Sequence, residues 1–211
     1  MSGVARPDTP TAAWNALREG NERFVSGRRE HPNQDADRRS EIAHGQRPFA
    51  LLFGCSDSRV AAEIIFDQGL GDLFVVRTAG HVVDAGVLGS IEFGIEVLRI
   101  PLVIVLGHDQ CGAVTATLAA HESGQMPSGF VRDVVERVSP SVLAAQQAGP
   151  VSLDDVIAEH TRQTAALLAE RSVAIAGQVA RGECAVAAVK YTLDDGRAQL
   201  LDAVGALNAG A

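Results

Sequence analysis

Residues 49–59 read FALLFGCSDSR and residues 102–112 read LVIVLGHDQCG: in both stretches a short apolar run ends at a glycine and polar groups follow. Continuous apolarity is typical of strands covered on both faces, as in a parallel sheet. Cys55 and His108 therefore come directly after predicted parallel strands. Open α/β sheets place their ligand crevices at the carboxyl ends of such strands. The two stretches thus predict both a fold class and the place of a site.

Apolar runs alternate with helical patterns along most of the chain. Strands are predicted at 49–54, 73–77, 102–107 and 185–191, an edge strand at 198–201, and helices at 61–66, 86–98 and 112–121. Residues 130–181 are mostly helical by pattern, with breaks expected at Pro140 and at Gly149-Pro150. These elements predict an α/β fold with a central, mostly parallel β-sheet flanked by helices.

The N-terminal region has a different pattern. Trp14, Leu17 and Phe24 recur at helical spacing within residues 11–27, where Thr11 is a plausible N-cap and Gly27 a stop, and a second short helix is predicted near 37–45. We predict an N-terminal helical arm over residues 1–45 and an α/β domain over residues 46–211 that holds the site, within a single domain overall. The amphipathic arm is suited to cover a neighbour's surface rather than its own.

Composition and charge indicate which partners and which compartment to expect. The 211 residues carry 18 basic and 26 acidic side chains, a formal charge of −8 that makes nucleic acid an unfavourable partner. The sequence shows neither the apolar core of a signal peptide nor a run long enough to cross a bilayer, so we expect a cytoplasmic protein with no membrane partner. Three cysteines do not make a disulfide framework.

Two of these cysteines and one histidine form a candidate metal site. His108 and Cys111 are three residues apart at a strand-to-helix junction, and Cys55 arrives from another strand. A Cys2His set suits zinc, whose fourth position is left to water in catalytic sites. The alternative is that the cysteines are core residues and the histidine is only hydrogen-bonded in place. Cys184 has no such neighbours and is predicted to be a packed core thiol.

Asp57 and Arg59 follow Cys55 closely and are predicted to form a bidentate pair, which keeps the carboxylate ionised. The pair is either an ordinary loop salt bridge or part of the site, where Asp57 accepts a hydrogen bond beside the metal or becomes its fourth ligand. Gly112 begins the next predicted helix, so its backbone N–H is suited to face an anion, or it only allows a tight turn.

The ordered motifs resemble the β-class carbonic anhydrases. The resemblance rests on Cys55-Ser56-Asp57-Ser58-Arg59, Phe74-Val75-Val76-Arg77, Ser90-Ile91-Glu92-Phe93 and Gly107-His108-x-x-Cys111-Gly112, and it extends over nearly the whole chain. It implies one Zn²⁺ per chain held by Cys55, His108 and Cys111, with Asp57 and Arg59 as the catalytic dyad. It also implies that Gln46 donates a hydrogen bond to the substrate and that Phe74, Ala79 and Phe93 line the carbon dioxide pocket.

A second subgroup of that family binds bicarbonate at an inhibitory site through a tryptophan, an arginine and a tyrosine. The tryptophan position is Leu52 here, although Arg77 and Tyr191 match the other two. The resemblance therefore implies an enzyme without that control.

The expected activity is the reversible hydration of carbon dioxide to bicarbonate and a proton, with a rate that rises with pH above neutrality. A homodimer or homotetramer is expected, with the active site near the interface. The alternatives are hydrolysis of carbon disulfide or carbonyl sulfide on the same fold, and a non-catalytic zinc or redox module. The other histidines are expected to be surface or packing residues: His31, His44, His81, His121 and His160.

Overall fold

A five-stranded mixed sheet organises the chain, which is described by a computed structural model covering residues 6–147, 149 and 151–208. The strands are β1 (Ala50–Cys55), β2 (Leu73–Thr78), β3 (Leu102–His108), β4 (Ala185–Tyr191) and β5 (Ala198–Val204). Their order is β2-β1-β3-β4-β5, and only β5 runs antiparallel to its neighbour. The predicted α/β fold with a mostly parallel sheet is confirmed.

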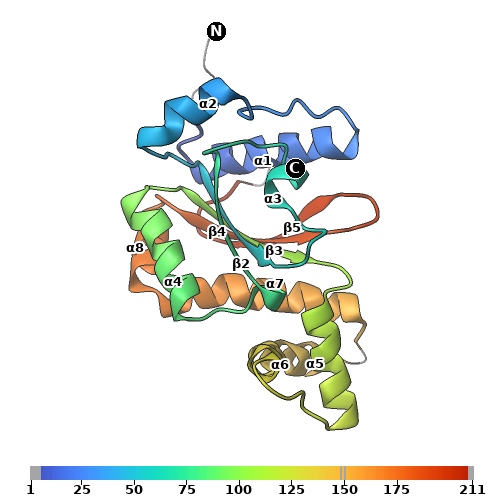
Figure 1. The fold of residues 1–211 in the computed structure, drawn as a ribbon. Helices are drawn as coiled ribbons and strands as arrows, with labels where there is room; N and C mark the ends of the chain where they lie inside the picture. The colour runs from blue at the N-terminus through green and yellow to red at the C-terminus, as the bar shows by residue number, and fades with distance from the viewer. Residues whose placement is uncertain (1–5, 148, 150, 209–211) are drawn as a thin grey trace.

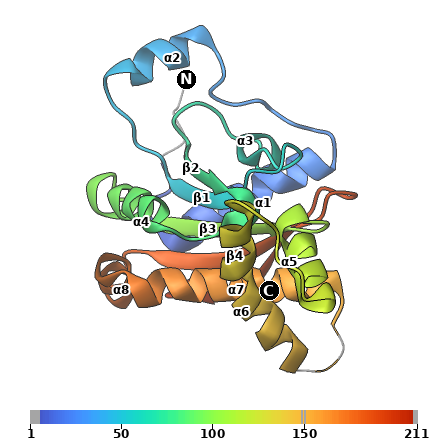
Figure 2. The same cartoon turned by 60° about the horizontal axis from the view of Figure 1, so that its bottom comes forward.

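Helices cover both faces of this sheet (Figure 1). Helices α1 and α3 lie on one face and α4, α7 and α8 on the other, whereas α5 and α6 lie together beside one end of the sheet (Figure 2). The helices are α1 (Pro10–Val25), α2 (Ala36–Glu41), α3 (Ala62–Ile65), α4 (Ala85–Glu92), α5 (Gly112–Ser123), α6 (Val131–Gln147), α7 (Leu153–Arg171) and α8 (Val173–Ala180), with 3-10 turns at Ile42–His44 and Ala79–His81 and a π-helical turn at Phe93–Val97. Among the described helices, none combines the length and apolarity that a membrane span requires.

The strand order reverses at β1, which decides where a site can form. β2 pairs with one edge of β1 and β3 pairs with the other, both in parallel. Chain connections leave the sheet in opposite directions from such a strand, so a crevice opens outside its carboxyl end. Cys55 and His108 are the last residues of β1 and β3 and therefore lie at that crevice.

Side chains of the central strands alternate between two apolar layers. Leu52 and Ile104 pack in the layer under α1, whereas Leu51, Phe53 and Val103 pack in the layer under α4 and α7. All five are no more than 1% exposed. Burial on both faces explains why the sequence of these strands is continuously apolar rather than alternating.

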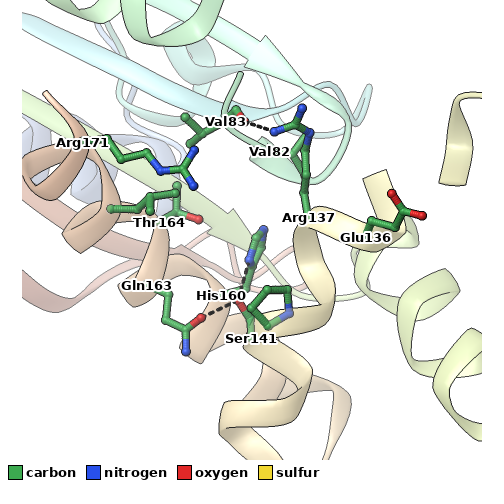
Figure 3. Close-up of a pocket in the computed structure, with 11 residues that line it drawn as sticks. Val82, Val83, Glu136, Arg137, Ser141, His160, Gln163, Thr164 and Arg171 are labelled. Carbon is green, nitrogen blue, oxygen red and sulfur yellow. Dashed lines mark hydrogen bonds between the residues drawn. The ribbon is translucent and has the colours of Figure 1, made fainter. Parts of the chain in front are cut away.

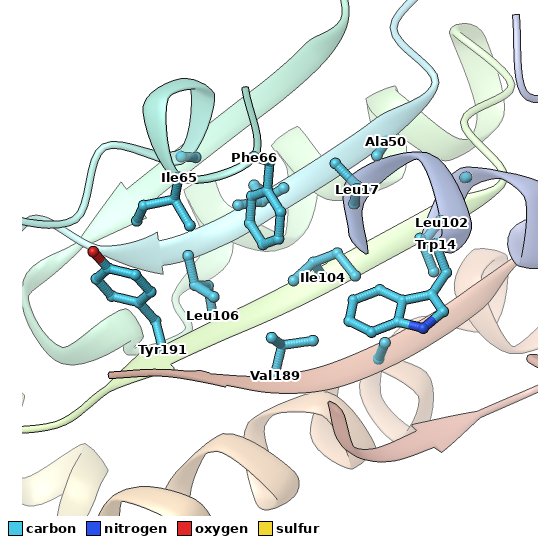
Figure 4. Packing of buried hydrophobic residues seen from close by; sticks show 14 of the residues in the cluster. Trp14, Leu17, Ala50, Ile65, Phe66, Leu102, Ile104, Leu106, Val189 and Tyr191 are labelled. Carbon is cyan, nitrogen blue, oxygen red and sulfur yellow. The ribbon is translucent and has the colours of Figure 1, made fainter. Parts of the chain in front are cut away.

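Helix α1 packs on the sheet of its own chain. Trp14 and Leu17 are 3% and 0% exposed and lie over Ile104 and Val189 (Figure 4). The N-cap is Thr9, whose side chain accepts from the Ala12 N–H, so the predicted cap at Thr11 is wrong. Pro10 at the first helical position explains the earlier start, because proline's fixed φ suits that position. The division of the chain at residues 45 and 46 stays a prediction.

Pro140 lies inside α6 and does not break it, which corrects the expected break. Proline removes one helical hydrogen bond, to the carbonyl four residues earlier, at a cost of about 3 kcal/mol in a helix interior. Here that carbonyl belongs to Glu136 and both residues are exposed, so water can satisfy it. Val135, Val138 and Val142 are fully buried on the other face and stabilise the helix. Pro150, named for the second break, lies outside the described residues.

Asn21 joins α1 to two other parts of the fold. Its Nδ2 donates to Ile65 O at 3.1 Å and to Gly196 O at 2.8 Å, and its Oδ1 accepts from Ala198 N at 2.9 Å. The side chain is buried, with 6% exposed, so water cannot replace these bonds. One amide thus satisfies three buried backbone groups.

We expect Asn21→Leu to lower the free energy of unfolding by about 2–4 kcal/mol, because it leaves buried backbone groups without partners. Urea unfolding at fixed protein concentration measures the change. Glu22→Leu, at an exposed position of the same helix, is the matched control and should leave the midpoint nearly unchanged. Equal midpoints for Asn21→Leu and wild type would contradict the assignment.

Candidate active site

Three side chains with metal-ligating atoms meet at the switch point of the sheet. Cys55 ends β1, His108 ends β3, and Cys111 is the N-cap residue of α5. Their ligand atoms lie within 4.8 Å of one another, and the residues are 6%, 0% and 0% exposed. The structure therefore brings together the three residues that the sequence singled out.

The protonation of His108 prepares it to bind a metal. Its Nδ1 lies 2.8 Å from Asp109 O. A carbonyl oxygen only accepts hydrogen bonds, so Nδ1 carries a proton, and in the neutral ring Nε2 keeps a free lone pair. Nε2 is buried and has no hydrogen-bond partner among the described residues. Buried polar atoms rarely lack a partner, and a metal ion at this point would satisfy Nε2.

The pKa values of the two thiols shift in opposite directions. Hydrogen bonding to Cys111, with smaller contributions from His108 and the Gly80 N–H, holds the pKa of Cys55 well below its usual range. The hydrogen bond to Cys55 and burial raise the pKa of Cys111. Burial lowers the pKa of His108, but its interactions with Cys55 outweigh this and the net shift is upward. Two sulfurs and one imidazole nitrogen are a donor set that fits zinc.

The backbone around His108 depends on a close helix contact. A Cβ on Gly107 would lie 2.0 Å from Thr161 Oγ1 of α7, so only glycine allows α7 to approach the strand here. Asp109 then anchors the turn, since its N–H donates to Tyr191 O at 3.1 Å and its Oδ1 accepts from Leu193 N at 2.8 Å. The turn holds Cys111 at the start of α5.

Asp57 and Arg59 form the predicted bidentate pair. Arg59 Nε donates to Oδ1 at 2.9 Å and Nη2 donates to Oδ2 at 2.7 Å, while the Arg59 backbone N–H also donates to Oδ1. The hydrogen bonds from Arg59 hold the pKa of Asp57 well below its usual range. The carboxylate is thus ionised at neutral pH and held by Arg59.

Arg77 supports the same loop in a way that the sequence did not reveal. Its Nε donates to Cys55 O at 2.8 Å and its Nη2 donates to Asp57 O at 2.6 Å. The available signal was its place near the carboxyl end of a strand, where Arg77 pairs in register with Gly54. That signal became usable only once β2 was known to lie beside β1.

The region of the family's inhibitory bicarbonate site is nearly closed in this chain. Leu52, Cys55 and Arg77 help to line a void of about 10 Å³, which has room for about one water molecule. Arg77 is engaged with the backbone, and Tyr191 is buried with 4% exposed. The absence of bicarbonate control there stays a prediction.

The predicted substrate residues fall into two groups. Ala79 precedes Gly80, whose N–H donates to Cys55 Sγ at 3.3 Å, and Gly112 follows Cys111; both are exposed beside the ligands. A Cβ on Gly112 would meet nothing within 4 Å, so packing does not require glycine there.

The second group lies away from the ligands within one chain. Phe74 pairs with Leu51, four residues before Cys55, which places it about 13 Å back along the strand. Phe93 has its ring centroid 6.3 Å from that of Phe74 and is 46% exposed. Gln46 is exposed and precedes the amino end of β1. Their assignment to the substrate pocket stays a prediction.

Cys184 is a core thiol, as predicted. It is 1% exposed and packs in the layer under α7 and α8, and burial raises its pKa to about 12. His81 and His160 are also buried, whereas the exposed histidines lie on the surface: His31, His44 and His121.

The fold and the donor set together define a protein of the open α/β class with a candidate metal site. Comparison with known families is more specific, because the family model described as carbonic anhydrase matches residues 50–198. The chain belongs to the carbonic anhydrase family, and within it to the β class.

Individual relatives agree with this assignment. "Carbonic anhydrase 2" of Mycobacterium tuberculosis (strain H37Rv) is 59% identical over 200 residues, 94% of this chain and 97% of the relative. The "Carbonic anhydrase" of Mycolicibacterium smegmatis is 56% identical over 196 residues, 93% of this chain and 95% of the relative. Among solved structures, the β-carbonic anhydrase CcaA superposes with a TM-score of 0.72 at 25% identity, covering 90% of this chain and 95% of that one.

We expect Arg77→Met to lower the free energy of unfolding by about 1–2 kcal/mol, because two charged hydrogen bonds to the loop are lost at a partly solvated position. Urea unfolding measures this. Arg132→Met, which removes an exposed ion pair with Glu136, is the control and should have no measurable effect. Equal stability of Arg77→Met and wild type would show that Arg77 does not hold the loop.

Proposed function

We propose that the chain catalyses the reversible hydration of carbon dioxide to bicarbonate and a proton, with one Zn²⁺ per chain. The observation that carries this proposal is the convergence of Cys55, Cys111 and the unpartnered His108 Nε2 at the switch point of the sheet. Membership of the carbonic anhydrase family supports the same reaction. Zinc bound by this set would lower the pKa of a water molecule and so supply hydroxide to attack carbon dioxide at neutral pH.

Asp57 and Arg59 act on the reacting water in this proposal. Oδ2 accepts only one of the hydrogen bonds from Arg59, so it keeps a lone pair for a hydrogen bond from that water. Arg59 fixes the direction of the carboxylate and keeps it ionised. An Asp57 released by Arg59 is free to bind the metal, and we propose that this closes the site at low pH.

A second copy of the chain completes the substrate pocket. Gln46, Phe74 and Phe93 lie away from the ligands of their own chain, and Phe93 exposes an aromatic surface that a partner would cover. We propose at least a homodimer in which these residues of one chain reach the metal centre of the other. One solved β-carbonic anhydrase similar in fold, from Sordaria macrospora, is described as tetrameric.

The compartment is part of the proposal. The three cysteines are free thiols, and two of them lie within reach of each other's sulfur. A reducing compartment such as the cytoplasm would keep them available as ligands.

Stopped-flow hydration of carbon dioxide tests the reaction. We expect a rate that rises with pH above neutrality, because two thiolates offset the charge of a divalent ion and leave its water less acidic than three histidines would. Cys55→Ser should lose zinc and activity, whereas Asp57→Asn should keep zinc and lose at least about 100-fold in kcat/KM. Cys184→Ser, which alters a core thiol, is the matched control and should keep both.

A zinc-loaded wild type that is inactive between pH 7 and 9 would contradict this function. Hydrolysis of carbon disulfide or carbonyl sulfide by the same sample would then establish the alternative enzyme. A protein that binds zinc and turns over none of the three substrates would be the non-catalytic module.

Mixing two inactive variants tests the shared pocket. Cys55→Ser lacks a ligand and Gln46→Ala lacks the predicted donor, but a heterodimer of the two contains one site built entirely from unaltered residues. Random exchange makes half of the dimers heterodimers, so activity should recover to about a quarter of wild type. No recovery after demonstrated subunit exchange would place Gln46 outside the partner's site.

A further inference from the structure

The backbone of Gly80 connects a candidate metal ligand to a buried histidine. Its N–H donates to Cys55 Sγ at 3.3 Å, and its carbonyl oxygen accepts from His160 Nε2 at 2.9 Å. Gly80 has a φ of +62°, and a Cβ there would lie 2.6 Å from Ala113 Cβ of α5. Glycine has wide backbone freedom, so the orientation of the two peptide planes that meet at its Cα depends on their hydrogen-bond partners.

The proton positions on His160 follow from its partners. Nε2 carries a proton, because the Gly80 carbonyl only accepts. Burial lowers the pKa of His160, so the ring is neutral and Nδ1 has a lone pair. Ser141 Oγ lies 2.9 Å from Nδ1 and can donate its proton there. Gln163 Oε1 lies at the same distance from Ser141 Oγ and competes for that one proton, but Gln163 is partly exposed, so water can satisfy its oxygen when the proton goes to Nδ1.

Packing holds the imidazole of His160 in one orientation. The ring of His81 stacks against it with centroids 4.4 Å apart, and Phe53 meets His81 edge-on. His81 is fully buried and neither of its ring nitrogens has a hydrogen-bond partner among the described residues. His81 therefore packs against the ring of His160 but takes no part in the hydrogen bonds that link Ser141, His160 and Gly80.

The residues that hydrogen-bond to His160 on its Nδ1 side lie at a hollow in the surface. His160, Ser141 and Gln163 lie close together at a hollow of about 330 Å³ between α6 and α7 (Figure 3). Arg137, on α6, donates to Val83 O at 2.8 Å on the same hollow and ties α6 to the segment after Gly80. The hydrogen bonds thus run from α6 through α7 to the loop beside Cys55.

We propose that His160 is a positioning residue of the metal centre: it holds the Gly80 carbonyl and so restricts the φ and ψ of Gly80, which keeps the Gly80 N–H aimed at Cys55 Sγ. Ser141, as the donor to Nδ1, supports the ring tautomer that carries its proton on Nε2. The inference rests on the proposed metal centre. A hydrogen bond to a thiolate sulfur lowers the energy of its lone pairs, and partners behind the ligands typically change metal affinity 10–100-fold.

Two substitutions of His160 separate hydrogen bonding from packing. His160→Phe keeps a ring against His81 and loses the donor, whereas His160→Gln places an amide nitrogen where Nε2 lies. In the cobalt(II)-substituted protein we expect the thiolate-to-cobalt charge-transfer band to shift to longer wavelength in His160→Phe and to stay near wild type in His160→Gln. Zinc affinity, measured by chelator competition, should fall about tenfold in His160→Phe and less than about threefold in His160→Gln.

His121 and Ser139 provide the matched control, because they form a similar histidine–serine hydrogen bond of 3.0 Å at the exposed surface. His121→Phe and His121→Gln should leave both the band and the affinity unchanged. If His160→Phe does not fold, His160→Asn replaces it, since its shorter amide reaches Ser141 and not Gly80. Ser141→Ala should shift the band in the same direction by a smaller amount.

An unchanged band and affinity in a folded His160→Phe or His160→Asn would overturn the proposal. Equal shifts in the Phe and Gln variants would also overturn it, because the effect would then come from packing. A wild-type protein that binds neither metal would instead overturn the metal centre itself.

Discussion

The parallel pairing of β1 with β3 is the contact on which the site depends. It places the ends of two buried strands side by side, so that Cys55 and His108 face one crevice although 53 residues separate them in the chain. Cys111 follows because the turn after β3 is short and leads directly into α5. The same pairing requires Gly107, since α7 crosses so close to the strand that a Cβ would collide with Thr161. Core packing and metal ligation are thus two consequences of one strand arrangement.

Backbone hydrogen bonds then determine how the ligands are presented. His108 is held through Asp109 O, Cys55 through the Gly80 N–H, and the loop after Cys55 through Arg77. These partners come from β2, from the turn after β2 and from the end of β3. A metal centre on this scaffold would therefore be stabilised by groups that carry no ligand atom themselves. Each of these groups orients a ligand or its loop through a hydrogen bond and adds no charge at the metal.

The position of the aromatic pair connects the fold to assembly. Phe74 and Phe93 lie together about 13 Å back from the ligand end of β1, with Phe93 half-exposed. Burying such a surface against a second copy would remove it from water. In the proposed dimer, oligomerisation and catalysis would be coupled by geometry, because the element that completes one site would also belong to the interface.

The sequence by itself determined the α/β class, the strand ends, the three candidate ligands and the Asp57-Arg59 pair. Each of these depends on local periodicity or on spacings of a few residues, which can be identified in the sequence. Local pattern also misplaces two features: it predicts the helix cap at Thr11, whereas Thr9 provides it, and a break at Pro140, which lies inside a helix that buried valines stabilise. Only the tertiary structure decided which strands are neighbours, and with them the contacts of Arg77, Gly80 and His160. The hydrogen bonds from Arg77 to the loop, from Gly80 to Cys55 and from His160 to Gly80 join residues 20 to 80 positions apart, and each has a backbone group at one end. A backbone carbonyl or N–H is the same at every residue type, so no sequence pattern marks the one that will be used.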